Sequence, residues 1–385
     1  MVKNLFHHKS LFIAALLVLI GLGGAVNKLI QGEHALGTTD LVPWGMLIAG
    51  YVFFAAAGTG VGLIASSGHA FGVKGLESLG TRGLFLALSL LIPGFALIGI
   101  ELGNPFHMFH VFLSPNFSSG IWWMSSLYSA YMALLVVECY LTQKQGHSPR
   151  ILSIVAYLTK TAAVANLGGI FGLLAVRSFW YGFYFPAYMV VTAVASGAAV
   201  LSIVLWFLQK SGRLAQSAEG LVAVMGKILV FSLVGTAVMV GAKLMLSLGS
   251  TVYGVREAAL AYISGPLAWR FWGLEVAAGI VIPMILLLTA KGRSAQVVTA
   301  SGLALAGMFA MRADFVTAGQ MIPLKVVEGV GDIMYHSYMA SITEWVMIAG
   351  AFGAAVLLYT ISETTFKMDD SIHGKAPSGN KSMVG

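Results

Sequence analysis

Charged residues are scarce in this chain. Only 10% of its 385 residues are Asp, Glu, Lys or Arg, whereas a soluble domain carries about 25%. The mean hydropathy is +0.86, and the apolar residues form continuous runs instead of the alternating pattern of a membrane barrel. The sequence therefore predicts an all-α integral membrane protein.

Cysteine is almost absent, and histidine is absent from the long apolar runs. The single Cys139 excludes an intramolecular disulfide and a cysteine-ligated iron–sulfur cluster. All nine histidines stand in connectors or tails, whereas a haem inside a helical bundle needs axial ligands that project from the helices. We expect no haem, no iron–sulfur cluster and no metal site in this chain.

The excess of seven basic residues does not indicate nucleic-acid binding. Lys and Arg stand in scattered pairs between the apolar runs, which is the distribution that sets membrane topology. We therefore expect membrane lipid around the chain and no nucleic acid. The glycine-rich stretches 58–62 and 168–172 lie inside apolar runs with no strand before them, so they indicate close helix contacts rather than phosphate loops.

Ten apolar runs are each close to the ~20 residues that cross a bilayer. We expect spans at about 11–27, 43–65, 83–101, 119–141, 151–175, 186–209, 220–247, 267–290, 295–317 and 339–362. The first run is too long for a typical signal peptide and lacks a good cleavage site. The expected organisation is a single transmembrane domain over 1–362, followed by a flexible tail over 363–385.

Lys and Arg are distributed unevenly among the connectors. Thirteen fall on one side and only four on the other, so both termini are expected on the cytoplasmic side. Seven of the eight Trp residues lie at or near the outer ends of the spans. This asymmetry indicates either a partner or aromatic ligand on the outer face, or a one-sided interfacial belt.

Ionisable residues inside the spans are costly in lipid and are candidates for function. The candidates for a proton path or for structural ion pairs are Glu138, Lys160, Glu275, Arg312, Asp314 and Glu344. Glu138 lies near the inner end of its span and could instead snorkel. A structural pair of Arg312 with Glu275 or Glu344 is a further alternative. Arg312 and Asp314 are two residues apart and therefore point to different neighbours.

The connector from residue 101 to 123 is unusually rich in chemistry. It holds one acid, two histidines, two prolines and a Trp pair, but no Lys or Arg. On the predicted topology it faces outward. His107 and His110 are suited to proton handling at the interface. Their spacing also fits two ligands of one metal, but no further ligands are evident, and plain interfacial polarity is the third reading.

Several motifs resemble one family of membrane proteins. These motifs are VPWGMLIAGYVFF with GTGVG (42–62), ELGNPF (101–106) with SSGIWWMSSLYSAY (118–131), FWGLEVAAGIVIP (271–283) and MRADFVTAGQ (311–320). They resemble the membrane subunit of polysulfide reductase and its relatives, the NrfD proteins and the HybB-type hydrogenase anchors. The ten-span layout, with Trp272 near Glu275 and Glu344 beside Trp345, is more similar to the longer HybB-like branch.

The resemblance implies a fold of two four-helix bundles, here about 43–175 and 186–317, with flanking helices. It implies a quinone-reactive subunit of a respiratory oxidoreductase complex in the bacterial cytoplasmic (inner) membrane. Menaquinone or ubiquinone would bind near the outer surface as substrate. The implied partners are a ferredoxin-like iron–sulfur subunit and a catalytic subunit, which is a molybdopterin enzyme, a hydrogenase or a multihaem cytochrome c. Proton translocation is a further possibility.

Part of the expected quinone site follows from the resemblance. The turn before the second span, residues 40–44, corresponds to part of the family's quinone pocket, and Arg312 matches the family's arginine. This chain has Asp40 where some members have a nearby His, and Asn104 where many have Arg. Quinol chemistry needs hydrogen-bonding groups, a base and an apolar entry. The residues that we predict to bind quinone are Asp40, Trp44, Glu101, His107, His110, Arg177 and Tyr181.

Two other functions are compatible with the same sequence. A secondary transporter also has buried charges in about ten spans, although neither an inverted repeat nor a clearly broken pair of helices is evident. A passive membrane anchor would use the buried charges only to hold its helices together.

Overall fold

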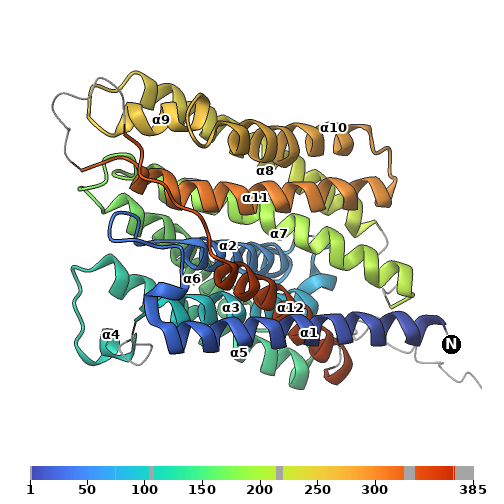
Figure 1. The fold of residues 1–385 in the computed structure, drawn as a ribbon. Coiled ribbons are helices and arrows are strands. Elements are labelled where there is room, and N and C mark those ends of the chain that lie inside the picture. Colours follow the sequence, from blue (N-terminus) through green and yellow to red (C-terminus); the bar gives the residue numbers. More distant parts are fainter. Residues whose placement is uncertain are drawn as a thin grey trace, which may run out of the picture.

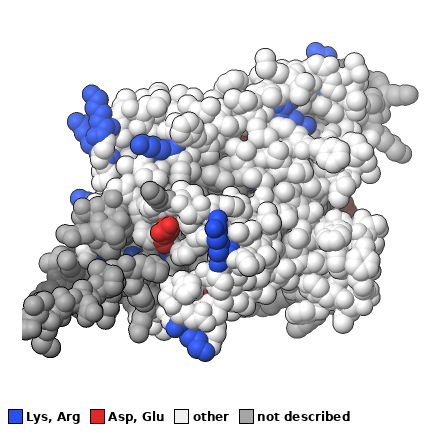
Figure 2. Space-filling view, turned by 180° about the vertical axis from the view of Figure 1, so that it is seen from behind, with Lys and Arg blue, Asp and Glu red and all other residues white. Residues whose placement is uncertain are grey.

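The computed structural model describes residues 2–73, 75–103, 108–213, 220–324, 334–366 and 368. In this part of the chain all regular structure is helical, and ten helices are long and apolar enough to cross a membrane. The prediction of an all-α, multi-pass membrane protein is confirmed. The long helices run side by side in one general direction (Figure 1). Most of the face in Figure 2 carries no charge, and its Lys and Arg side chains stand apart from one another on a mainly uncharged surface.

The membrane helices begin and end close to the predicted spans. They are α1 (Val2–Gln31), α2 (Met46–Phe71), α3 (Gly80–Glu101), α5 (Gly120–Gln145), α6 (Arg150–Gly172), α7 (Tyr184–Ser211), α8 (Leu221–Leu248), η5 (Arg270–Val281) with α10 (Ile282–Thr289), α11 (Ser294–Met321) and α12 (Ile342–Thr365). Short helices lie in the connectors. They are η1 (Gly32–Ala35), η2 (Glu77–Leu79), α4 (His110–Leu113) and α9 (Val255–Ile263).

Helix α2 forms the centre of the molecule. Its most apolar stretch is 94% buried, and it packs against α3, α6, α7, α11 and α12. The predicted close contact occurs here: a Cβ atom on Gly60 would overlap the carbonyl oxygen of Ala193 on α7. Only a residue without a side chain allows the two backbones to approach so closely. Because α2 contacts helices of both halves, the division into bundles 43–175 and 186–317 stays a prediction.

The first and last helices pack against each other at the edge of the molecule. Helix α1 lies along α12, and the two touch at Gly21 and Gly350, where an added Cβ would meet backbone atoms. Asn27 donates a hydrogen bond to Thr343 at 3.0 Å. Only 22% of the most apolar stretch of α1 is buried, so this helix presents most of its surface to lipid.

One span contains a long stretch of π-helix. Residues Arg270–Val281 form η5, and Pro283 follows in the first turn of α10. Proline lacks the N–H group that would continue the hydrogen-bond ladder, which agrees with a change of helix type just before it. π-Helical turns are uncommon and often occur at functional sites. This turn carries Glu275, one of the predicted buried charges.

The connectors at one end of the molecule carry η1, α4 and α9 (left in Figure 1). This is the end that the distribution of Lys and Arg predicts to face outward, and it is called the outer end below. Residues 369–385 of the predicted flexible tail lie outside the described residues.

Candidate functional site

Trp44 lies at the outer end of α2, held by a side chain from the far end of the sequence. Gln320 accepts a hydrogen bond from the Trp44 N–H at 2.9 Å and donates one to the Trp44 carbonyl at 2.9 Å. The Trp44 ring stacks on Trp180, with ring centroids 5.5 Å apart, and meets the edge of Phe171 at 5.4 Å. These contacts fix a half-buried aromatic platform near the outer surface.

Arg177 belongs to the same cluster. Its Nη1 donates to the carbonyl oxygens of Gln320 at 3.3 Å and Ile322 at 3.2 Å. A cation at the C-terminal end of α11 also interacts favourably with the helix dipole. Partial burial lowers the pKa of Arg177, but an arginine remains charged at neutral pH. The structure therefore joins two predicted quinone-binding residues, Trp44 and Arg177, through Gln320, which the sequence did not single out.

The other predicted quinone-binding residues lie around the outer end. Asp40 and Tyr181 are exposed on connectors. His110 is exposed on α4, which packs on α5. Glu101 ends α3 within electrostatic range of Glu344, and one of its oxygens is buried with no hydrogen-bond partner among the described residues. His107 lies outside the described residues.

Glu344 connects the beginnings of two helices. Its carboxylate accepts hydrogen bonds from the N–H groups of Gly37 (2.8 Å), Met46 (2.9 Å) and Ser341 (2.8 Å) and from the Tyr338 hydroxyl (2.6 Å). It thus satisfies donors at the N-termini of both α2 and α12, where the helix dipoles also favour an anion. This contact set, rather than the suggested pair with Arg312, accounts for the buried charge.

Tyr338 and Gly45 complete this arrangement. Burial, together with the neighbouring Glu344 carboxylate, raises the pKa of Tyr338. The hydroxyl group therefore stays protonated and donates a hydrogen bond to Glu344. A Cβ atom at Gly45 would overlap a carboxylate oxygen of Glu344. The glycine just before α2 is therefore required for the carboxylate to reach the helix end.

Arg312 and Asp314 contact different helices, as predicted from their spacing. The Arg312 side chain donates to the Thr192 hydroxyl at 2.6 Å and lies over the Tyr188 ring of α7. Asp314 forms an ion pair with Arg270 of η5. Glu275 lies within electrostatic range of both Asp314 and Arg312.

Glu138 and Lys160 form a second buried pair toward the other end of the molecule. Lys160 Nζ donates to Glu138 at 3.0 Å and to the Ser66 hydroxyl at 2.5 Å. Both charged side chains are at most 2% exposed, so the alternative that Glu138 snorkels is wrong. The pairing was missed, although both residues lie at a similar depth on two consecutive spans, which is a usable signal.

Hydroxyl groups lie between the two sets of buried charges. Lys160 Nζ is 5.7 Å from the centre of the Tyr131 ring. The Tyr131 and Tyr128 rings are 6.2 Å apart, and Tyr128 lies within electrostatic range of Arg312. Both tyrosine hydroxyl groups are buried without a hydrogen-bond partner among the described residues, so hydrogen bonds do not connect the two sets of charges at this point. These hydroxyl groups were not predicted, because Tyr inside an apolar span gives no distinctive sequence signal.

In the described part of the chain, no three His, Cys, Asp or Glu side chains come together as a metal site would require.

Comparison with known proteins gives consistent matches. Residues 34–324 match the family model described as polysulphide reductase, NrfD. The chain is 21% identical to a subunit of selenate reductase from Mesobacillus selenatarsenatis, over 94% of this chain and 93% of that protein. It is 23% identical to an Hdr-like menaquinol oxidoreductase integral membrane subunit of Archaeoglobus fulgidus, over 87% of this chain and 88% of that protein.

Proposed function

This chain belongs to the polysulphide reductase NrfD family, and from that premise we propose that it is the quinone-interacting membrane subunit of a respiratory oxidoreductase complex. It exchanges electrons between membrane quinol or quinone and an iron–sulfur or cytochrome partner on the periplasmic side. The catalytic subunit of the complex is a molybdopterin enzyme, a hydrogenase or a multihaem cytochrome c. The complex lies in the bacterial inner membrane.

The observation that carries this proposal is the cluster of Trp44, Gln320, Arg177 and Trp180 at the outer end. It supplies a fixed aromatic surface for a ring and polar groups beside it, on a protein surrounded by lipid. Asp40, on the connector before α2, and Glu101, at the outer end of α3, are the acids that we propose to accept protons from a quinol. One relative is named as a subunit of a menaquinol oxidoreductase, which favours menaquinone over ubiquinone as the substrate.

Quinol oxidation releases two protons, and the proposal includes a route for protons through the interior. The proposed route runs along three groups of buried polar side chains described above. They are the Glu138–Lys160 pair, the two tyrosines Tyr131 and Tyr128, and Arg312 with Glu275 and Asp314. Hydroxyl and carboxyl groups can both give and accept protons. Glu344 is outside this route, because backbone groups and Tyr338 occupy its oxygens.

The test is quinol oxidation by the purified complex, with the partner's acceptor present and a menaquinol analogue as substrate. Gln320→Leu removes both hydrogen bonds that hold the Trp44 backbone, and we expect turnover to fall about 10–100-fold because the ring-binding surface moves. Trp123→Ala is the matched control, since Trp123 is a half-exposed outer-end tryptophan whose ring N–H donates to Phe117, away from the Trp44 cluster.

A wild-type complex that neither oxidises quinol nor reduces quinone would overturn the proposed function. Normal turnover of Gln320→Leu would remove the Trp44 cluster from the site while leaving the broader function in place.

A further inference from the structure

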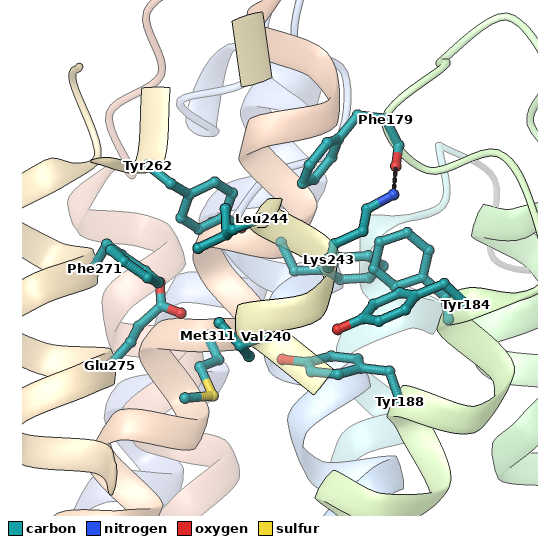
Figure 3. A pocket seen from close by; sticks show the side chains of 12 residues that line it. Phe179, Tyr184, Tyr188, Val240, Lys243, Leu244, Tyr262, Phe271, Glu275 and Met311 are labelled. Carbon is teal, nitrogen blue, oxygen red and sulfur yellow. Dashed lines mark hydrogen bonds between the residues drawn. The ribbon is translucent and has the colours of Figure 1, made fainter. Parts of the chain in front are cut away.

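A pocket lies in the half of the molecule that contains η5, and the function proposed above does not use its opening. It is bordered by α7, α8, α9, η5 and α11 near the outer end (Figure 3). Seven of its twelve lining residues are aromatic. The pocket has a volume of about 40 Å³, which is enough for a few water molecules or for one edge of a ring.

Lys243 provides the hydrogen-bond donors of this pocket. Its ammonium group donates to the Phe179 carbonyl at 2.9 Å and lies 4.9–5.5 Å from the centres of the Phe179, Tyr184 and Phe185 rings. An ammonium group has three donors, so donors remain for a ligand. The hydroxyl groups of Tyr184 and Tyr188 point into the same space (Figure 3).

Glu275 provides an acceptor across the pocket from Lys243. It is 3% exposed, and its Oε1 has no hydrogen-bond partner among the described residues. Its side chain is directed from the π-helical η5 toward the pocket (Figure 3). A buried oxygen without a partner is costly, and a ligand hydroxyl in the pocket would remove that cost.

The charges restrict what this pocket can hold. Lys243 would repel a cation, whereas a neutral ring with oxygen atoms on opposite sides can bond to both Lys243 and Glu275. Apolar side chains next to the lining residues in the sequence, namely Met245, Leu246 and Trp272, are exposed on the surface. This apolar surface suits a lipid-soluble molecule.

We propose that this pocket binds the head group of a second quinone or hydroquinone, distinct from the one at the Trp44 cluster. Lys243 donates to one ring oxygen. On the opposite side, Glu275 as a carboxylate accepts from the hydroxyl of a hydroquinone, or as a protonated carboxyl group donates to the carbonyl of a quinone. One edge of the ring occupies the pocket volume given above, and the remainder of the head group extends out of it. The choice of a quinone rests on the proposed function, while the need for a neutral ring with two oxygens rests on the pocket alone.

Phe315 connects the two sites. Its ring lines the pocket, and its backbone carbonyl accepts a hydrogen bond from Trp180, the residue that stacks on Trp44. Because the sites share this wall, an activity assay alone does not separate them. Binding at each site has to be located directly on the chain.

The experiment is photoaffinity labelling of the purified complex with a short-chain azidoquinone, followed by mapping of the labelled peptides. Wild type should carry label both near Trp44 and in the segments 240–244 and 271–275. Lys243→Met and Glu275→Gln should each reduce label in those two segments about tenfold or more, with label near Trp44 retained. Tyr184→Phe, which removes only a hydroxyl, should give a smaller reduction.

Lys227→Met is the matched control, because Lys227 is exposed on the same helix α8; its labelling should equal that of wild type. Label confined to the Trp44 region would overturn the second site while leaving the proposed function intact. Label in the two segments that Lys243→Met and Glu275→Gln leave unchanged would also overturn it. A complex that binds the probe in 240–244 and 271–275 but oxidises no quinol would overturn the proposed function alone.

Discussion

Replacing Lys160 by Met removes one charge from a pair that protein encloses completely. Leaving a buried charge without its partner typically costs about 3–5 kcal/mol. We therefore expect Lys160→Met to lower the free energy of unfolding by about 3–5 kcal/mol.

The reverse substitution and the double variant complete a thermodynamic cycle. Glu138→Gln leaves the ammonium group without its partner and should also cost about 3–5 kcal/mol. The double variant has no buried charge and loses only hydrogen bonds, including the one to Ser66, so it should cost about 1–2 kcal/mol. A cost far below the sum of the two single variants is the mark of a coupled pair.

The measurement is reversible unfolding of the purified protein by SDS in mixed micelles, followed by tryptophan fluorescence. Single variants that cost less than about 1 kcal/mol, or costs that simply add, would refute the reasoning and indicate that water reaches the pair.

Four further outcomes follow from other parts of the structure. Glu344→Gln should lower the free energy of unfolding by about 3 kcal/mol in the same assay. Hydrogen bonds to a charged acceptor are each worth roughly 1.5–3 kcal/mol, and the amide oxygen cannot accept all four. Unchanged stability would mean that the helix ends are hydrated. Gly60→Ala should destabilise the protein by more than about 2 kcal/mol. Gly99→Ala, where an added Cβ meets nothing within 4 Å, should be neutral or slightly stabilising. Equal effects of the two substitutions would contradict the close contact of α2 and α7. Arg312→Met should abolish proton movement, measured with a pH-sensitive dye in proteoliposomes, while quinol turnover persists; intact proton movement would exclude Arg312 from the route. The paired changes His107→Ala and His110→Ala should reduce quinol turnover about tenfold or more in a complex that still assembles, and unchanged turnover would remove both histidines from the mechanism.

The architecture was accessible from the sequence because lipid imposes it. A chain with so few charges must bury its backbone polar groups in helices, and each helix needs about 20 apolar residues. The different neighbours of Arg312 and Asp314 also followed from helix geometry alone, since residues two apart point away from each other.

The identity of the neighbours was less accessible. The sequence suggested an ion pair of Arg312 with Glu275 or Glu344. In the structure Arg312 donates a hydrogen bond to Thr192, and Arg270 forms the ion pair with Asp314. Which side chains meet depends on how each helix is rotated and on which helices are adjacent, and neither is encoded in a single span. The same limit hid Gln320, which lies 276 positions from its partner Trp44, and the change to π-helix around Glu275.

The contact between α1 and α12 has a consequence for the biogenesis of the protein. Gly21 and Gly350 touch, yet the ribosome makes the second glycine 329 residues after the first. At about 5–20 residues per second, that interval lasts roughly 15–65 s. During this time α1 lies in the bilayer without its partner helix α12. The insertion machinery or a chaperone has to prevent the glycine-lined face of α1 from associating with other helices. Truncation before α12 would therefore leave the glycine-lined face of α1 without a packing partner, and membrane quality-control proteases would degrade such a product.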